Sequence, residues 1–196
     1  MSEPASRGTR EAILDAAEEL LRRHGPAKTN VVDVARKLGM SHANVYRHFA
    51  SKAALQDAVT ARWLHHVSAP LAVIADAQGD AAIRLEQWVL ALAHAKRRKV
   101  LDDAELFATY HAIAEAARDV VDAHMAELAG QVARIIAAGV AADQFRVRDP
   151  AAAAGVVLDA ILRFHHPHFV RDHPGEDAQI RQAMALLLAG LRSGVI

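Results

Sequence analysis

The chain has 196 residues, enough for one large domain or for a small domain joined to a medium one. Hydrophobic residues make up 53% of it, and strand-type runs of Val, Ile, Thr and aromatic residues are rare, so we expect an all-α protein. Cysteine is absent, which excludes disulfides and thiolate metal sites. The polar segment from Met1 to Arg10 does not resemble a signal peptide, and no apolar stretch is long enough to span a bilayer. We therefore expect a cytoplasmic protein with no membrane partner.

The net charge of zero argues at first against nucleic-acid binding, but the charge is unevenly distributed. Residues 1–62 hold ten Lys and Arg against seven Asp and Glu, whereas residues 63–196 hold thirteen against sixteen. Between Lys28 and Lys52 there are five basic residues and one acid, Asp33. A local basic patch is what phosphate binding needs, although a solvated basic surface has the same composition.

Capping residues and apolar periodicity predict the helices in chain order. The first covers about residues 10–24 and ends at Gly25. Asn30 caps a second, Ser41 a short third and Ser51 a long fourth. Later helices are expected over about 81–99, about 102–115, a stretch ending near 138 before Gly139, about 149–170 and about 176–192. This gives about nine helices, with an N-terminal domain over residues 1–50 and a larger helical domain over 51–196.

Residues 30–48 combine two short helices with a turn centred on Gly39, which is the arrangement of a helix-turn-helix. Val45 and Phe49 are expected to bury the inner side of the second helix. Its outer side is expected to enter a DNA major groove and carries His42, Ala43, Asn44 and Arg47. Asparagine can pair bidentately with adenine, and arginine can pair with guanine or phosphate.

Three stretches of this motif resemble the signature of the TetR family of transcriptional repressors: Asp33–Ala35, Leu38–Ser41 and Val45–Lys52. They correspond to that family's acidic-aliphatic-Ala segment, its Gly-Val-Ser turn and its Tyr-x-His-Phe-x-x-Lys ending. The resemblance covers roughly residues 8–62. It implies a ligand-responsive repressor that binds a palindromic double-stranded operator as a homodimer and is released by a small-molecule inducer. No catalytic activity and no cofactor are implied.

The resemblance also assigns phosphate contacts residue by residue. Tyr46 and His48 correspond to phosphate-contacting groups, and Lys52 lies where such proteins grip phosphate at the start of the fourth helix. Asn30 occupies a position that often touches the DNA backbone. The alternative for Tyr46 is a core aromatic with a satisfied hydroxyl.

The base-facing part of the recognition helix corresponds to His42, Ala43 and Asn44. Position 42 is often Lys or Arg in this family, so His42 is a departure. Met40 replaces a common Val, which predicts a change in packing only. The alternative for Asn44 is an ordinary exposed helix residue.

In that family the last two helices pair across a two-fold axis, which suits an operator with two half-sites. The apolar residues of the eighth helix that fit this role are Val156, Val157, Ala160 and Ile161. Those of the ninth are Met184, Leu187, Leu188 and Leu191. The alternative for either set is the core of a single chain.

An inducer pocket is expected among the fourth to eighth helices. Its candidate lining residues are Trp63, Val67, Trp88, Leu92, Phe107, Tyr110, His111 and Phe164. Each is also compatible with an ordinary core position.

Nine of the twelve histidines follow residue 62. His165 and His168 are three residues apart and His111 and Glu115 four, so each pair is expected to share a helical side and to offer two ligands for Zn or Ni. A metal-responsive regulator of the same family is therefore an alternative, and a helical metal-dependent enzyme is a weaker one. The motifs of common enzyme classes are absent from the sequence. Pro167 is expected to distort the helix that carries His165.

Overall fold

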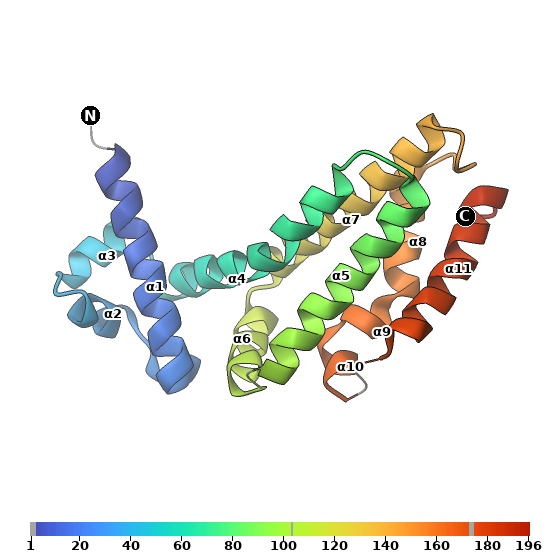
Figure 1. Cartoon of the computed structure of the whole chain (residues 1–196). Helices are drawn as coiled ribbons and strands as arrows, with labels where there is room; N and C mark the ends of the chain where they lie inside the picture. Colours follow the sequence, from blue (N-terminus) through green and yellow to red (C-terminus); the bar gives the residue numbers. More distant parts are fainter. Residues whose placement is uncertain (1–2, 103, 173–174) are drawn as a thin grey trace. The chain divides into compact units, whose positions relative to one another are not determined.

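The computed structural model describes the backbone of residues 3–102, 104–172 and 175–196, and the side chains of these ranges other than those of 3–7, 101, 102, 104–106, 108, 110, 167, 171 and 172. Within these residues the regular secondary structure is entirely helical, which confirms the predicted fold class (Figure 1). The helices are α1 (Glu3–Lys28), α2 (Val31–Lys37), α3 (His42–His48), α4 (Lys52–Ala75), α5 (Ala81–Asp102), α6 (Ala104–Ala116), α7 (Arg118–Ala141), α8 (Pro150–Ala160), α9 (Leu162–His165), α10 (Pro167–Asp172) and α11 (Asp177–Ser193). None of the helices described is long and apolar enough to cross a membrane.

The described residues form eleven helices where about nine were expected, because the predicted eighth helix is divided into three. α8 ends at Ala160, and the four-residue α9 ends before His166, whose φ of −73° and ψ of 130° are extended. Proline disfavours the helical conformation in the residue before it, so Pro167 accounts for the second break and begins α10. The distortion expected at Pro167 is therefore found.

Contacts between Cα atoms divide the chain into two compact units. Unit 1 comprises Met1–Leu64 and Glu105–Val121, and unit 2 comprises His65–Ala104 and Asp122–Ile196. The helix α4 begins in unit 1 and ends in unit 2. Each unit has its own hydrophobic core.

The core of unit 1 is built by α1 to α4 together with α6. Its buried residues include Ile13, Leu14, Leu21, Val34, Val45, Phe49, Leu55, Val59 and Ile113. Arg62 of α4 holds α1 at the edge of this core, since its Nε donates to Glu18 Oε1 at 2.9 Å and its Nη1 to Asp15 Oδ1 at 2.7 Å. These contacts fix α4 against α1, the helix that supports the helix-turn-helix.

The core of unit 2 contains a buried hydrogen-bond relay that links three helices. Trp88 of α5 donates through Nε1 to Oε1 of Gln131 in α7 at 2.9 Å. The amide nitrogen of Gln131 donates in turn to the Ser68 carbonyl of α4 at 3.0 Å. All three groups are buried, so each hydrogen bond avoids the cost of an unsatisfied polar group in an apolar interior.

Replacing Gln131 by leucine is expected to lower the free energy of unfolding by about 1–3 kcal/mol, because the change leaves the Trp88 indole N–H without its acceptor. Urea unfolding followed by tryptophan fluorescence measures this loss. Gln87→Leu makes the same change at an exposed position of α5 and is expected to stay within about 0.5 kcal/mol of the unmodified protein. Equal losses in the two variants would argue that the relay contributes nothing.

Candidate nucleic-acid interface

The turn between α2 and α3 has the geometry expected from its glycine. Gly39 has a φ of 64°, the left-handed conformation that glycine adopts without steric cost. The Met40 N–H donates to the Ala35 carbonyl at 3.0 Å, and the Gly39 N–H to the Arg36 carbonyl at 3.2 Å. These two bonds form a Schellman motif, which ends α2 and turns the chain sharply into α3.

Both predicted helix caps are present around this turn. The Asn30 side chain accepts from the Asp33 N–H at 3.0 Å, and the Ser41 hydroxyl accepts from the Asn44 N–H at 3.3 Å. Val45 and Phe49 are buried in the core of unit 1, as expected. The helix α3 is therefore held by its inner side and both of its ends, which leaves its outer side to solvent.

The outer side of α3 forms a polar surface with a shallow hollow at its start. His42, Ala43 and Arg47 are exposed and Asn44 is half-buried. The hollow measures about 390 Å³, and its lining residues are Ser41, Ala43, Asn44 and Arg47. Three of these four residues were expected to face DNA from the sequence; Ser41 was expected only as a cap.

Asn44 is held in place by two neighbours that the sequence did not indicate. Its Oδ1 accepts from Arg47 Nη2 at 2.7 Å, and its Nδ2 donates to the Met40 sulfur at 3.6 Å. The sulfur is a weak acceptor, so the contact with Arg47 is the stronger restraint. The expectation that Met40 changes packing only is wrong, because its thioether also positions the Asn44 amide.

The four residues expected to contact phosphate differ in their surroundings. Tyr46 is 46% exposed, which rules out the core alternative, and His48 is half-buried. Asn30 is exposed apart from its capping bond. Lys52 is half-buried, and its ammonium donates to the Pro26 carbonyl at 3.0 Å, so it also ties the start of α4 to the last turn of α1.

Arg10 is a further candidate for contact with DNA that the sequence does not indicate. Its guanidinium lies 5.0 Å from the centroid of the Phe49 ring, and its side chain is exposed. Stacking on an aromatic ring orients the guanidinium beside the end of α3. No pattern in the sequence links Arg10 to Phe49, because the contact joins α1 to the residue that follows α3, far away in the sequence.

The eight residues expected to bind an inducer belong to both units. Trp63, Phe107, Tyr110 and His111 lie in unit 1, and Val67, Trp88, Leu92 and Phe164 lie in unit 2. All four in unit 2 are buried in one core. In unit 1 the half-buried His111 stacks on the buried Phe107, with 6.1 Å between ring centroids. The side chain of Tyr110 lies outside the described residues.

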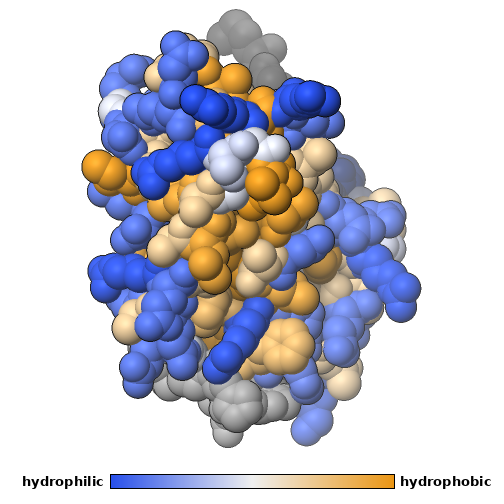
Figure 2. All heavy atoms as spheres, turned by 90° about the vertical axis from the view of Figure 1, so that its right-hand side faces the viewer, coloured by the Kyte–Doolittle hydropathy of each residue, from blue (hydrophilic) through white to orange (hydrophobic). Residues whose placement is uncertain are grey.

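Most of the apolar residues expected at a dimer interface are core residues of unit 2. The buried ones are Val157, Ile161, Met184, Leu187, Leu188 and Leu191, so for these the core alternative is correct. The residues of α8 and α11 that are exposed in the single chain include Val156, at 48%, and Leu186, at 77%. Figure 2, viewed from the side on which α11 lies in Figure 1, shows hydrophobic surface in the middle of this side with hydrophilic residues around it.

The histidine pairs do not assemble a metal site in the described part of the chain, where no group of three His, Cys, Asp or Glu side chains has suitable spacing. His111 and Glu115 do share a helical side, with 3.6 Å between Nε2 and Oε1. The prediction that His165 and His168 share one side of a helix is wrong. His165 is buried in α9 and His168 is exposed in α10, because the backbone is extended at His166 between them.

Comparison with curated proteins finds relatives among DNA-binding regulators. The HTH-type transcriptional repressor Rv3405c of Mycobacterium tuberculosis is 36% identical over 72 residues, which are 37% of this chain and 36% of that protein. The nucleoid occlusion factor SlmA of Marinobacter nauticus is 35% identical over 78 residues, 40% of each chain. The chain thus matches well under half the length of these relatives.

Solved structures match over nearly the whole chain. SmeT of Stenotrophomonas maltophilia in complex with triclosan superposes with a TM-score of 0.66, at 22% identity, covering 96% of this chain and 94% of SmeT. FadR of Bacillus subtilis in complex with stearoyl-CoA gives a TM-score of 0.61, at 15% identity, covering 92% of this chain and 98% of FadR. At these identities the likeness shows the fold alone.

Two family models match the sequence. The model of bacterial regulatory proteins of the tetR family matches residues 13–59, which contain the helix-turn-helix. The model of the tetracyclin repressor-like C-terminal domain matches residues 81–186, more than half of the 196-residue chain. The chain therefore belongs to the TetR family, whose members are DNA-binding transcriptional regulators rather than enzymes.

Proposed function

We propose that this protein is a transcriptional repressor that binds a palindromic operator as a homodimer and releases it when a small-molecule inducer binds. The observation that carries the proposal is the outer side of α3, which is polar and solvent-exposed while both ends of the helix are fixed. A recognition helix needs this combination of a rigid support and polar side chains that DNA can reach. The name of Rv3405c, a repressor, supports the direction of control. Since the partner is genomic DNA, the proposed site of action is the cytoplasm.

In this proposal the residues that contact DNA form two classes, those that meet base edges and those that meet phosphates. His42, Ala43, Asn44 and Arg47 meet base edges, and the last three of them line the hollow at the start of α3. The phosphate contacts come from Asn30, Tyr46, His48 and Lys52, which position the helix without reading sequence. The Asn44–Arg47 hydrogen bond supports a joint role, because an asparagine oriented by arginine presents a fixed amide to the groove.

Asn44→Ala is expected to reduce discrimination between operator and scrambled DNA by about 1–3 kcal/mol, because a bidentate contact to one base is lost. Tyr46→Phe is expected to weaken both DNAs equally, since a phosphate contact carries no base information. Titration of labelled duplexes at fixed salt, followed by fluorescence anisotropy, separates the two effects. If Asn44→Ala weakened operator and scrambled DNA by the same factor, Asn44 would not be a base reader.

A double-mutant cycle tests whether Asn44 and Arg47 act together. Because the two side chains share a hydrogen bond of 2.7 Å, the losses from Asn44→Ala and Arg47→Ala are expected not to add. Additive losses would mean that each residue contacts DNA independently.

The dimer is proposed to form through the exposed apolar residues of α8 and α11. Val156 and Leu186 are large, exposed and carried by two helices that pack on each other in unit 2. Exposed apolar surface of this kind is typical of a subunit interface, and a two-fold dimer would supply the two recognition helices of a palindrome.

Inducer binding is proposed for residues 51–196, and operator binding for residues 1–50. Ligand-bound SmeT and FadR support the first assignment, since both structures share this fold and contain small molecules. All eight sequence candidates remain proposed ligand contacts, and the four in unit 2 share a core. The helix α4 begins in unit 1 with the helix-turn-helix and ends in unit 2, so a ligand that prefers one position of α4 would shift the operator-binding equilibrium. No observation favours the metal-responsive alternative.

A further inference from the structure

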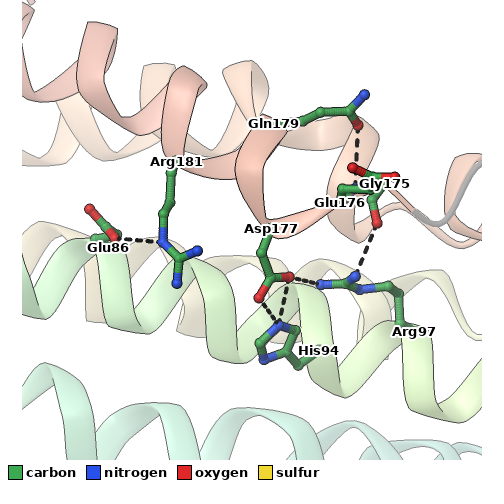
Figure 3. Close-up of polar contacts among 8 residues, drawn as sticks. All are labelled: Glu86, His94, Arg97, Gly175, Glu176, Asp177, Gln179 and Arg181. Carbon is green, nitrogen blue, oxygen red and sulfur yellow. Dashed lines mark hydrogen bonds and ion pairs between the residues drawn. The ribbon is translucent and has the colours of Figure 1, made fainter.

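The helix α5 carries basic residues near its C-terminal end that differ in how they are neutralised. His94 and Arg97 both bind Asp177 at the start of α11, as Figure 3 shows. His94 Nε2 lies 2.9 Å from Asp177 Oδ1, and Arg97 additionally donates to the Gly175 carbonyl at 3.0 Å. Lys96 lies between them in sequence but has no such partner, since no carboxylate in the described part of the chain forms an ion pair with it.

Lys96 is instead buried together with two histidines from other helices of unit 2. Lys96 of α5 is 7% exposed, His124 of α7 is 6% exposed and His165 of α9 is 4% exposed. The three groups are close enough to influence one another electrostatically. One turn away from them on their helices, or next to them in sequence, lie Leu92, Leu128 and Phe164, which belong to the apolar core of unit 2.

The hydrogen bonds within this cluster are incomplete. Both ring nitrogens of His124 are buried, and neither has a partner among the described residues. One ring nitrogen of His165 has a partner, because Nε2 lies 3.2 Å from the Leu158 carbonyl oxygen. Since a carbonyl oxygen only accepts, Nε2 carries the ring proton and donates it in this hydrogen bond. An unpartnered imidazole in an apolar interior costs about 1–3 kcal/mol, so the arrangement destabilises the ligand-free protein.

The protonation states of Lys96, His124 and His165 indicate which kind of ligand the cluster would bind. Burial and the neighbouring Lys96 lower the pKa of His124 to about 3, and burial lowers the pKa of His165 to about 4, so both imidazoles are neutral near pH 7. Burial lowers the pKa of Lys96 only to about 8, which leaves the ammonium largely protonated at that pH. The cluster therefore offers one positive charge and at least one N–H donor, and no carboxylate among the described side chains pairs with it.

We propose that Lys96 and His124, with His165 beside them, bind the head group of a monoanionic ligand, a carboxylate whose apolar tail occupies the core around Leu92, Leu128 and Phe164. One buried cation matches one negative charge, whereas a dianionic phosphate would leave a charge unpaired. Placed here, the carboxylate accepts from the Lys96 ammonium and from a His124 N–H. The proposal names the chemical class of the inducer and so rests on the proposed function. The short α9, with breaks on both sides, is the least regular part of the wall around the cluster.

Full-length protein is titrated calorimetrically with octanoate, decanoate, dodecanoate and benzoate, and with the alcohol that corresponds to each. At least one carboxylate is expected to bind roughly 10- to 100-fold more tightly than its alcohol, because a charge-assisted hydrogen bond is added. Proton uptake is also expected in buffers of different ionisation enthalpy, since an anion beside Lys96 and His124 raises both pKa values. Equal binding of acid and alcohol, or no binding of any carboxylate, would overturn the proposal.

Lys96→Met is expected to abolish the preference for the acid, and Arg98→Met, which removes a charge from the exposed side of α5, is expected to retain it. Without ligand, Lys96→Met is expected to melt roughly 2–4 °C higher than the unmodified protein, because a buried unpaired charge is removed. That result also shows that the variant is folded. His124→Leu is expected to weaken acid binding and serves as the second variant. A preference that survives in both variants contradicts the assignment.

Measuring release of the operator distinguishes a failure of this inference from a failure of the proposed function. Decanoate that binds through Lys96 but leaves the operator complex intact would support the anion site and contradict ligand-controlled release. Release by neutral alcohols with no acid preference would support ligand control and overturn the anion site.

Discussion

Lowering the pH from about 7 to about 5 is expected to reduce the free energy of unfolding by about 2–4 kcal/mol, chiefly through His124 and His165. Both histidines have folded-state pKa values, about 3 and about 4, below the unfolded value of 6.5. Between those values the unfolded chain binds more protons than the folded chain, so stability falls as the pH drops below about 6.5. Above that pH both histidines are neutral in the folded and in the unfolded chain, so they add nothing further to the pH dependence of the free energy of unfolding.

The groups around the two histidines fix the sign of this effect. His124 interacts with Lys96, His165 and Lys99, all of which oppose its protonation. His165 interacts with Lys96 and His166, which oppose protonation, and with Asp159 and the Leu158 carbonyl, which favour it less strongly than burial opposes it. Asp177 also has a lowered pKa, owing to Arg97 and His94, but its loss of charge belongs to pH values below about 4.

Urea unfolding at several pH values measures the effect, with Trp88 fluorescence in a Trp63→Phe background reporting on unit 2. The double variant His124→Leu, His165→Leu is expected to lose most of the dependence between about pH 7 and about pH 5. His66→Leu, a change at an exposed position of α4, is expected to keep it. If the free energy of unfolding of the double variant still fell as steeply between about pH 7 and about pH 5, the two buried imidazoles would not be the source of the pH dependence.

Leu188→Lys and Leu186→Lys are expected to have opposite consequences although the two residues lie on the same helix. Leu188 is 7% exposed and belongs to the core of unit 2, whereas Leu186 is 77% exposed in the single chain. A lysine at position 188 places an unpaired charge in the core at a cost on the order of 5 kcal/mol, comparable to the whole stability of a domain. A lysine at position 186 places the charge in the proposed interface, so the protein is expected to stay folded and become monomeric.

Sedimentation velocity and circular dichroism distinguish these outcomes. The unmodified protein is expected to sediment as a dimer, Leu186→Lys as a folded monomer, and Leu188→Lys to lose helical signal or aggregate. A folded dimer in Leu186→Lys would remove α11 from the interface. A fully folded Leu188→Lys would contradict the core position of that leucine.

Local signals in the sequence were sufficient for the starts of α2 and α3 and for the turn between them. The bounds predicted for the first helix, about residues 10–24, were too narrow: α1 spans Glu3–Lys28, with Gly25 in a non-helical conformation inside it. The caps at Asn30 and Ser41 and the turn at Gly39 use interactions within four or five residues, so the sequence contains everything that determines them. The start of α8 was predictable for the same reason, because Asp149 accepts from the N–H groups of Ala151 and Ala152 at 2.9 and 3.0 Å. The family resemblance covers the same region and correctly indicated which side of α3 is buried.

Features that depend on contacts between helices were predicted less well. Gly139 was expected to end the seventh helix, but α7 continues to Ala141, and the missing side chain instead gives Phe145 room against the helix. On α11 the strongest apolar repeat belongs to the core of the same chain, and the exposed Leu186 falls outside it. The cluster of Lys96, His124 and His165 joins three helices, and no spacing in the sequence relates them.

Selection of bound sequences from a random pool of duplex DNA, using the full-length protein, tests the central claim most directly. A dimer that presents two α3 helices is expected to enrich an inverted repeat, with half-site centres about 10 base pairs or a multiple of that apart. The same selection with Asn44→Ala is expected to lose preference at one symmetric pair of positions while keeping the spacing. Enrichment of an unpaired half-site, or of no sequence at all, would contradict the account of this protein as a dimeric operator-binding repressor.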